Sequence, residues 1–149
     1  MPGTLAHSPG DILRRVIIDL GLGIDPETNA SENTWPVYAE GESDKPDTAI
    51  TVRTTVGVAG PRMMINGEYN DADGVQVRIR AGNHTTGWVK AKAVDQALCA
   101  LSLKTISFGS ASYLVWSLSR SGTINPLGNE PGNKRKLFTI NYLMMVEQR

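Results

Sequence analysis

Thiol and imidazole groups are scarce in this sequence, which contains one cysteine, Cys99, and two histidines, His7 and His84. A lone thiol cannot form a disulfide within the chain and cannot supply a cysteine-rich zinc site, so a reducing compartment is favoured. The two histidines share no spacing typical of metal ligands. We therefore expect no metal centre. We also expect Cys99 to be a small buried side chain within a helix.

An excess of either charge and long apolar runs are also missing. Fifteen Lys and Arg balance fifteen Asp and Glu, so no strong overall field attracts the protein to nucleic acid or to an anionic membrane. No run approaches the ~18 apolar residues that a membrane-spanning helix needs, and residues 1–11 lack a basic stretch followed by an apolar one. We expect neither membrane insertion nor export by a standard signal.

Motifs for nucleotide, calcium or nucleophile chemistry are incomplete. Gly21-Leu22-Gly23 follows a predicted helix rather than a strand, and residues 128–135 have the wrong spacing for a phosphate loop. Residues 71–74 resemble the middle of a calcium loop, but Arg80 stands where the last carboxylate should be, which favours a plain Asp-Gly turn. His84 is interpreted as a surface or helix-capping residue. We expect no enzymatic activity and no cofactor.

The sequence does contain the pattern of one globular domain over residues 1–149, with 40% hydrophobic and 20% charged residues. Ser8-Pro9-Gly10-Asp11 is a helix start, and apolar residues at three- and four-residue spacing follow until Gly21 or Gly23. A second amphipathic helix is predicted at roughly His84–Lys104. Its apolar stripe comprises Trp88, Ala91, Val94, Leu98 and Leu101.

Alternation of apolar and polar residues predicts the strands. Thr48–Val58 has Ile50, Val52 and Val56 on one face, and a short extended piece is expected near Trp35–Ala39. We interpret Arg62–Tyr69 and Val75–Ala81 as a hairpin. Ser110–Arg120 and Lys136–Val146 are expected to pair antiparallel across a long loop, 121–135. The fold class is α+β: a mainly antiparallel sheet of about five to six strands packed by two amphipathic helices.

Two local basic groups have two possible interpretations. Arg78 and Arg80 alternate on the polar face of one predicted strand, and Lys134-Arg135-Lys136 follow one another at the end of the long loop. They are either solvated faces or contacts to nucleic acid or to an acidic partner, because clustered Lys and Arg suffice for phosphate binding.

Two apolar runs break the alternation, at Met63-Met64-Ile65 and at Leu143–Val146. A strand without a polar face is covered on both sides, either by the domain's own helices or by a neighbouring subunit, and both readings stay open. The candidate partner-binding residues are Arg62, Met63, Met64, Arg78, Arg80, Lys134, Arg135 and Lys136.

From about Ser8 to Leu118 the chain resembles the tail terminator and minor tail or neck proteins of long-tailed bacteriophages. The resemblance is carried by the order of several segments rather than by one motif. These are the Asp11–Arg15 helix start, Trp35-Pro36-Val37-Tyr38, Pro46-Asp47 leading into Ile50-Thr51-Val52, Gly57, the strand Val75–Ala81, and a second helix rich in small residues.

The resemblance implies a structural virion protein made in the host cytoplasm. Such an α+β subunit assembles with identical copies into a ring, typically a hexamer, which ends the tail tube and joins it to the head. The implied partners are itself, the major tail tube protein and a head-tail connector, with possible non-specific contact to passing DNA. Loops at Val58–Arg62, Ser121–Arg135 and Asn29–Asp44 are candidate contacts. The alternatives are another connector or head-completion subunit, or a small nucleic-acid-binding module.

Overall fold

A computed structural model describes residues 5–26, 35–41, 47–60, 71–132 and 134–148. Within these ranges the chain forms two helices and seven strands, an α+β fold as predicted. In chain order they are α1 (Pro9–Asp19), β1 (Val37–Ala39), β2 (Ala49–Val58), β3 (Ala72–Ala81), α2 (His84–Cys99), β4 (Ser102–Phe108), β5 (Ala111–Arg120), β6 (Asn125–Asn129) and β7 (Lys136–Gln148).

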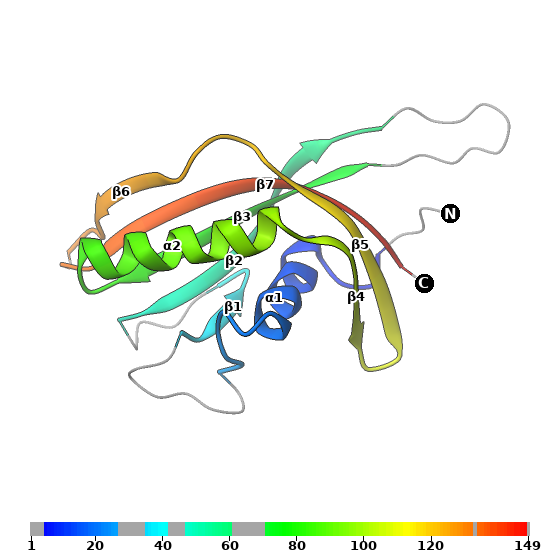
Figure 1. Cartoon of the computed structure of the whole chain (residues 1–149), viewed down its shortest axis with the longest axis horizontal. Coiled ribbons are helices and arrows are strands. Elements are labelled where there is room, and N and C mark those ends of the chain that lie inside the picture. Colours follow the sequence, from blue (N-terminus) through cyan, green and yellow to red (C-terminus); the bar gives the residue numbers. More distant parts are fainter. Residues whose placement is uncertain (1–4, 27–34, 42–46, 61–70, 133, 149) are drawn as a thin grey trace, which may run out of the picture.

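The strands form one curled sheet with the order β1-β2-β3-β7-β5-β4, and β6 pairs with the other end of the β7 edge that β5 occupies (Figure 1). Every pairing is antiparallel except that of β1 with β2. The predicted antiparallel pairing of the two C-terminal strands is confirmed as β5 with β7. The order leaves β1 and β4 at the two ends of the sheet.

Both helices begin with the side-chain caps that their sequences provide. Ser8 Oγ accepts a hydrogen bond from the Asp11 amide at 3.2 Å, and Asn83 Oδ1 accepts one from the Thr86 amide at 2.8 Å. Helix α1 ends as predicted, because Gly21 follows it with a left-handed φ of 74°. The cap of α2 is Asn83 rather than His84, which is the exposed first residue of that helix.

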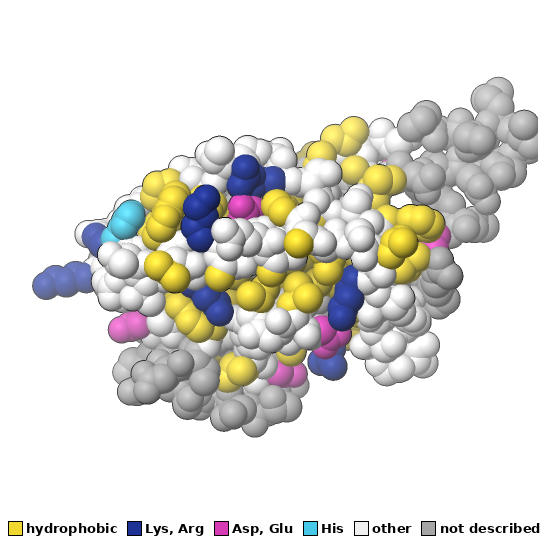
Figure 2. Space-filling view, in the orientation of Figure 1, with side chains coloured by type: hydrophobic (Ala, Val, Ile, Leu, Met, Phe, Trp, Pro, Cys, Tyr) yellow, Lys and Arg dark blue, Asp and Glu magenta, His cyan; other side chains and the backbone are white. Residues whose placement is uncertain are grey.

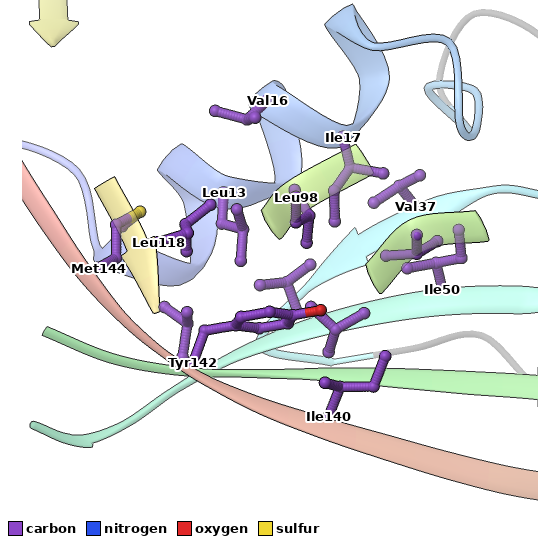
Figure 3. Close-up of a cluster of buried hydrophobic side chains, with 14 of the residues drawn as sticks. Leu13, Val16, Ile17, Val37, Ile50, Leu98, Leu118, Ile140, Tyr142 and Met144 are labelled. Carbon is purple, nitrogen blue, oxygen red and sulfur yellow. The ribbon is translucent and has the colours of Figure 1, made fainter. Parts of the chain in front are cut away.

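The core lies between the two helices and one face of the sheet (Figure 3). Leu13 and Ile17 from α1 and Leu98 from α2 are fully buried with Ile140 and Tyr142 of β7. These residues recur every three or four positions in the helices and every second position in β7, which is why the sequence pattern predicts them. We call this helix-covered side of the sheet the inner face and the opposite side the outer face.

Helix α2 lies close to β7 at Gly87, which is buried. A Cβ atom at this position would overlap the ring of Phe138 and would lie 3.2 Å from the Ala81 Cβ. The helix can sit this low on the sheet only because residue 87 has no side chain.

Substitution Gly87→Val is therefore expected to lower the free energy of unfolding by about 2–3 kcal/mol through overpacking. Urea denaturation of the variant and the wild type measures this difference. Gly82→Val is the control, because nothing lies within 4 Å of a Cβ there. Equal losses in the two variants would contradict the role of the close approach at Gly87.

The predicted second helix is too long. It ends at Cys99, and residues 102–108 form β4, which pairs with β5. The prediction extended the helix because Leu101 lies three residues after Leu98 and packs on the core. Leu101 does so from the connection that follows the helix. Trp88, also placed on the stripe, is 36% exposed.

The predicted hairpin of Arg62–Tyr69 with Val75–Ala81 is wrong in its pairing. Strand β3 pairs with β2 on one edge and with β7 on the other, so neither edge is open to another strand. Residues 62–69 lie outside the described residues. The Asp-Gly signal at 73–74 marks an irregularity inside a strand, because a Cβ on Gly74 would overlap the Val56 carbonyl where the β2–β3 register shifts.

The predicted long loop 121–135 contains a strand, β6, which spans Asn125–Asn129. β6 continues the antiparallel ladder of β5 along the same edge of β7, with Asn125 opposite Thr139 and Asn129 opposite Lys136. The turn between β6 and β7 is closed by a 2.7 Å hydrogen bond from the Glu130 amide to the Arg135 carbonyl. Glycines and prolines at 126, 128, 131 and 132 conceal this strand from pattern analysis.

Strands β2 and β3 extend beyond the helices as a two-stranded arm (Figure 1). In β2 the residues from Ala49 to Val52 are buried, whereas those from Thr54 to Val58 are exposed. Val56 was predicted to share the buried face of Ile50 and Val52, but it is 96% exposed because no helix reaches it. We call residues 54–58 and 72–74 the β2–β3 arm.

Candidate functional site

Three large apolar side chains lie exposed on neighbouring strands at one end of the sheet. Leu103 of β4 is 60% exposed, Trp116 of β5 is 46% exposed and Met145 of β7 is 39% exposed. Single exposed apolar residues are common on soluble proteins, but a contiguous group usually marks an interaction surface. We call these three residues the outer apolar row.

The strand register places the three side chains in one row. Leu103 and Trp116 lie between the partner pairs Ser102 with Ser117 and Lys104 with Val115. On the other side of β5, a bulge between Val115 and Ser117 brings Trp116 beside Met145. Met144 is fully buried on the inner face, so alternation along β7 puts Met145 on the outer face. Trp116 at the β5 bulge and Leu103 opposite it are assigned to the same row by their exposure and register.

The row runs to the open edge of the sheet. Within the described ranges β4 pairs with β5 alone, so its second edge has no strand neighbour. Leu103 has a left-handed φ of 51°, a conformation that is uncommon for a residue other than glycine. An unpaired strand edge beside exposed apolar side chains favours association with another chain.

A second apolar surface lies on the solvent side of α2. Trp35, Thr85, Thr86, Val89, Lys90 and Ala93 line a shallow groove of about 340 Å³, and we call it the α2 groove. Val89 is 62% exposed, and the Lys90 ammonium lies 5.3 Å from the centre of the Trp35 ring. Partial burial lowers the pKa of Lys90. Figure 2 shows hydrophobic side chains together with Lys or Arg over this part of the molecule.

A polar network fixes α2 to the end of the sheet that carries the outer apolar row. Asp95 is 5% exposed, and its carboxylate accepts hydrogen bonds from the Tyr142 hydroxyl at 2.9 Å and from Arg120 Nη1 at 2.6 Å. Cys99 Sγ lies 3.4 Å from the same carboxylate. Asp95 lies outside the apolar stripe of the predicted second helix, yet it is buried, because Arg120 and Tyr142 satisfy its charge in the interior.

Tyr142 makes this network sensitive to high pH. Burial, and then its hydrogen bond to Asp95, raise the pKa of the Tyr142 hydroxyl far above 10 in the folded protein. Above pH 10 the unfolded chain loses this proton while the folded chain keeps it, so folding stability falls as the pH rises.

We expect the wild type to lose up to about 1.4 kcal/mol more stability per pH unit above pH 10 than Tyr142→Phe does. Urea denaturation of both proteins at pH 8, 10 and 11 measures the difference. Parallel pH profiles would show that Tyr142 titrates in the folded protein as it does in the unfolded chain.

Two of the basic residues predicted to bind partners are used inside the fold. Arg80 is 1% exposed and donates from Nε to the Asp47 carbonyl at 3.2 Å. Arg135 is 5% exposed and forms ion pairs with Glu130 at 2.6 Å and with Asp47 at 3.6 Å. The prediction that Arg80 lies on a solvated face is wrong, because its guanidinium fastens the segment before β2 to the sheet.

The other predicted partner-binding residues have different positions. Lys134 is exposed in the β6–β7 turn, Lys136 lies beside Asn129 at the start of β7, and Arg78 is half-buried opposite Thr51. The structure thus brings Arg80 and Arg135 together at Asp47 rather than presenting two basic patches. Arg62, Met63 and Met64 lie outside the described residues.

The apolar run Leu143–Val146 divides between the two faces of β7. Met144 is fully buried in the core, whereas Met145 belongs to the outer apolar row. Leu103 was not predicted as an interface residue, because it fell inside the overlong helix. Trp116 was predicted only as part of the strand Ser110–Arg120. The signal was present in residues 102–108, where Ile106 and Phe108 alternate with Thr105 and Ser107.

The one cysteine and the two histidines contact neighbouring side chains of the fold. Cys99 is exposed at the end of α2, so the prediction of a buried side chain is wrong. His84 is exposed and packs against Phe138 with ring centres 5.3 Å apart. His7 stacks on Phe108 and contacts the Tyr113 hydroxyl at 2.5 Å, which attaches the segment before α1 to β4 and β5.

Among the described residues, no three His, Cys, Asp or Glu side chains gather in a way that fits a metal ion. In the same part of the chain, no helix has the length and apolar character required to cross a membrane.

Comparison of the whole chain with protein families and with curated proteins yields no match. The functional interpretation therefore rests on the geometry of the outer apolar row, the α2 groove and the β2–β3 arm.

Proposed function

We propose that this protein is a structural subunit of a bacteriophage tail, a tail terminator that self-associates into a ring, caps the tail tube and joins it to the head. The observation that carries the proposal is the outer apolar row at the open edge of the sheet. An exposed row of Leu, Trp and Met beside an unpaired strand is suited to protein contact rather than to chemistry. The α+β fold agrees with what the sequence resemblance implies.

The row must be one part of a larger contact surface. Burying the exposed parts of three apolar side chains, roughly half of each, contributes about 3 kcal/mol at 1.5–3 kcal/mol for a full side chain. Association costs at least about 4 kcal/mol in lost translational and rotational freedom. A stable subunit contact therefore needs a partner surface that adds to the row.

The β2–β3 arm is the surface that we assign to the tail tube. It projects beyond the helices and carries Val56 and Val58, which are 96% and 58% exposed. It also leads into the predicted contact loop Val58–Arg62, of which residues 58–60 are described. An exposed apolar arm gives the ring a second contact that is separate from the one between its subunits.

Alternative roles differ in their partners. A connector or head-completion subunit would bind the head side of the neck and would leave the tube protein alone. The nucleic-acid-binding alternative depends on the two basic groups, and the burial of Arg80 and Arg135 removes two of their charges from the surface.

A mixture of this protein with the major tail tube protein is expected to give tubes of limited length with a cap at one end, seen by negative-stain electron microscopy. The Val56→Ser/Val58→Ser variant should retain its self-associated mass but fail to cap the tubes. Thr105→Ser/Ser107→Thr on β4 is the control and should cap normally. Tubes of unchanged length with the wild-type protein would refute the assignment as a terminator.

A further inference from the structure

The two apolar surfaces belong to opposite sides of the sheet. The outer apolar row is on the face of the sheet that the helices leave open, whereas the α2 groove is on the solvent side of a helix that covers the inner face. One protomer cannot bring its own row against its own groove, because the sheet lies between them. A second copy can bring them together.

The shapes and contents of the two surfaces are complementary. The row presents Trp116 and Met145 outward from the sheet, and the groove is a shallow hollow walled by Trp35 and Val89. Trp and Met are the residue types that are enriched in the centres of protein interfaces, and a hollow receives them with little loss of packing.

The charges beside the two surfaces are also complementary. Glu147 is two residues beyond Met145 in β7 and stands opposite Leu114, which places a carboxylate beside the row. The groove contains Lys90, and Lys92 lies over the Trp88 ring at 5.8 Å on the same helix. Opposite charges at the rim of an interface fix its orientation and disfavour contact of a surface with its own kind.

We propose that the outer apolar row of one copy packs into the α2 groove of the next copy, so that subunits join head to tail. A contact between two different surfaces leaves one free row and one free groove at the ends of any chain of subunits, and such contacts build rings or filaments. A contact of the row with itself would instead stop at a dimer. This inference rests on the proposed function, because it names the subunit contact of that ring.

Single engineered cysteines test the contact in a Cys99→Ser background, which removes the natural exposed thiol. Met145→Cys labels the row and Val89→Cys labels the groove. After oxidation, a mixture of the two variants is expected to give a covalent dimer on a non-reducing gel. Each variant alone should run on the gel as a monomer, because it has no cysteine on the facing surface. One chain that carries both cysteines should give a ladder of higher multimers.

Leu127→Cys is the matched control for Met145→Cys. Leu127 is 49% exposed on β6 and lies near Leu137, about 26 Å along β7 from Met145 at ~3.3 Å per residue. Mixed with Val89→Cys, this variant should remain uncrosslinked. Light scattering before oxidation reports the mass of every variant and so shows whether each one is associated, and circular dichroism shows whether each one is folded.

The crosslinking results distinguish the proposed contact of row with groove from a symmetric contact, from association through other surfaces, and from no association. Efficient crosslinking of Met145→Cys with itself would show a symmetric contact and overturn the inference. Associated protein without a crosslink between residues 145 and 89 would overturn the inference and leave the proposed ring intact. Monomeric protein in every sample, including the wild type, would overturn both.

Discussion

Replacing Asp95 with Ala is expected to lower the free energy of unfolding by about 3 kcal/mol. The substitution leaves the buried Tyr142 hydroxyl without its acceptor and removes the ion partner of Arg120. Loss of a partner in a buried charged pair costs ~3–5 kcal/mol, and the partial exposure of Arg120 reduces this figure. Urea denaturation followed by circular dichroism gives the value.

Two further variants separate the network from a general loss of charge. Asp95→Asn keeps an acceptor for Tyr142 and loses only the charge facing Arg120, so a smaller loss of about 1 kcal/mol is expected. Asp19→Ala removes an exposed carboxylate that pairs with Arg15 at 3.5 Å and should change stability by less than about 0.5 kcal/mol. A loss at Asp95 no larger than that at Asp19 would contradict the description of the network.

Replacing Trp116 with Ser is expected to weaken self-association by about 30-fold or more, which corresponds to about 2 kcal/mol. Trp116 is the largest side chain of the outer apolar row and its middle member, with Leu103 on one side and Met145 on the other. Its exposure of 46% means that the loss of core packing is small compared with the loss of contact area. Sedimentation velocity over a range of concentrations measures the dissociation constant.

Leu127→Ser is the control for this variant, since Leu127 has a similar exposure of 49% but lies on β6, away from the row. Its dissociation constant should equal that of the wild type. If both substitutions weaken association equally, the effect is due to general surface hydrophobicity rather than to the row.

Local signals predict the elements whose structure is decided locally. The Ser8 cap, the Pro9 start and the spacing from Ile12 to Leu20 determine α1, and alternation identifies β2 as a strand, although its first four residues are buried on both faces. The antiparallel pairing of β5 with β7 was predictable because two segments rich in strand-forming residues lie in the same third of the chain. These features require no knowledge of which distant residues meet.

The errors occur where distant parts of the chain override a local signal. The apparent stripe through Leu101 extended α2 into β4, and the Asp-Gly pair at 73–74 resembled a turn although the β2–β3 bulge requires its glycine. Arg80 alternates like a surface residue, but the segment around Asp47 covers it. Such burial depends on segments about thirty residues away, which periodicity cannot report.

The candidate site was predictable only in part. The apolar run containing Met145 left open a cover by the domain's own helices or by a neighbouring subunit, and the structure buries Met144 in the core and exposes Met145. Leu103 and Trp116 join it only through the register of three strands and the bulge in β5. The α2 groove likewise combines Trp35 with residues from 85 to 93, which lie far apart in the sequence.

The mass of the purified wild-type protein in solution tests the central claim most directly, since the claim is that copies of this chain cover one another's exposed apolar surfaces. Multi-angle light scattering should give a multiple of the 16.1 kDa chain mass that falls toward one chain on dilution or with Trp116→Ser. A single 16.1 kDa species at every concentration tested would contradict the account.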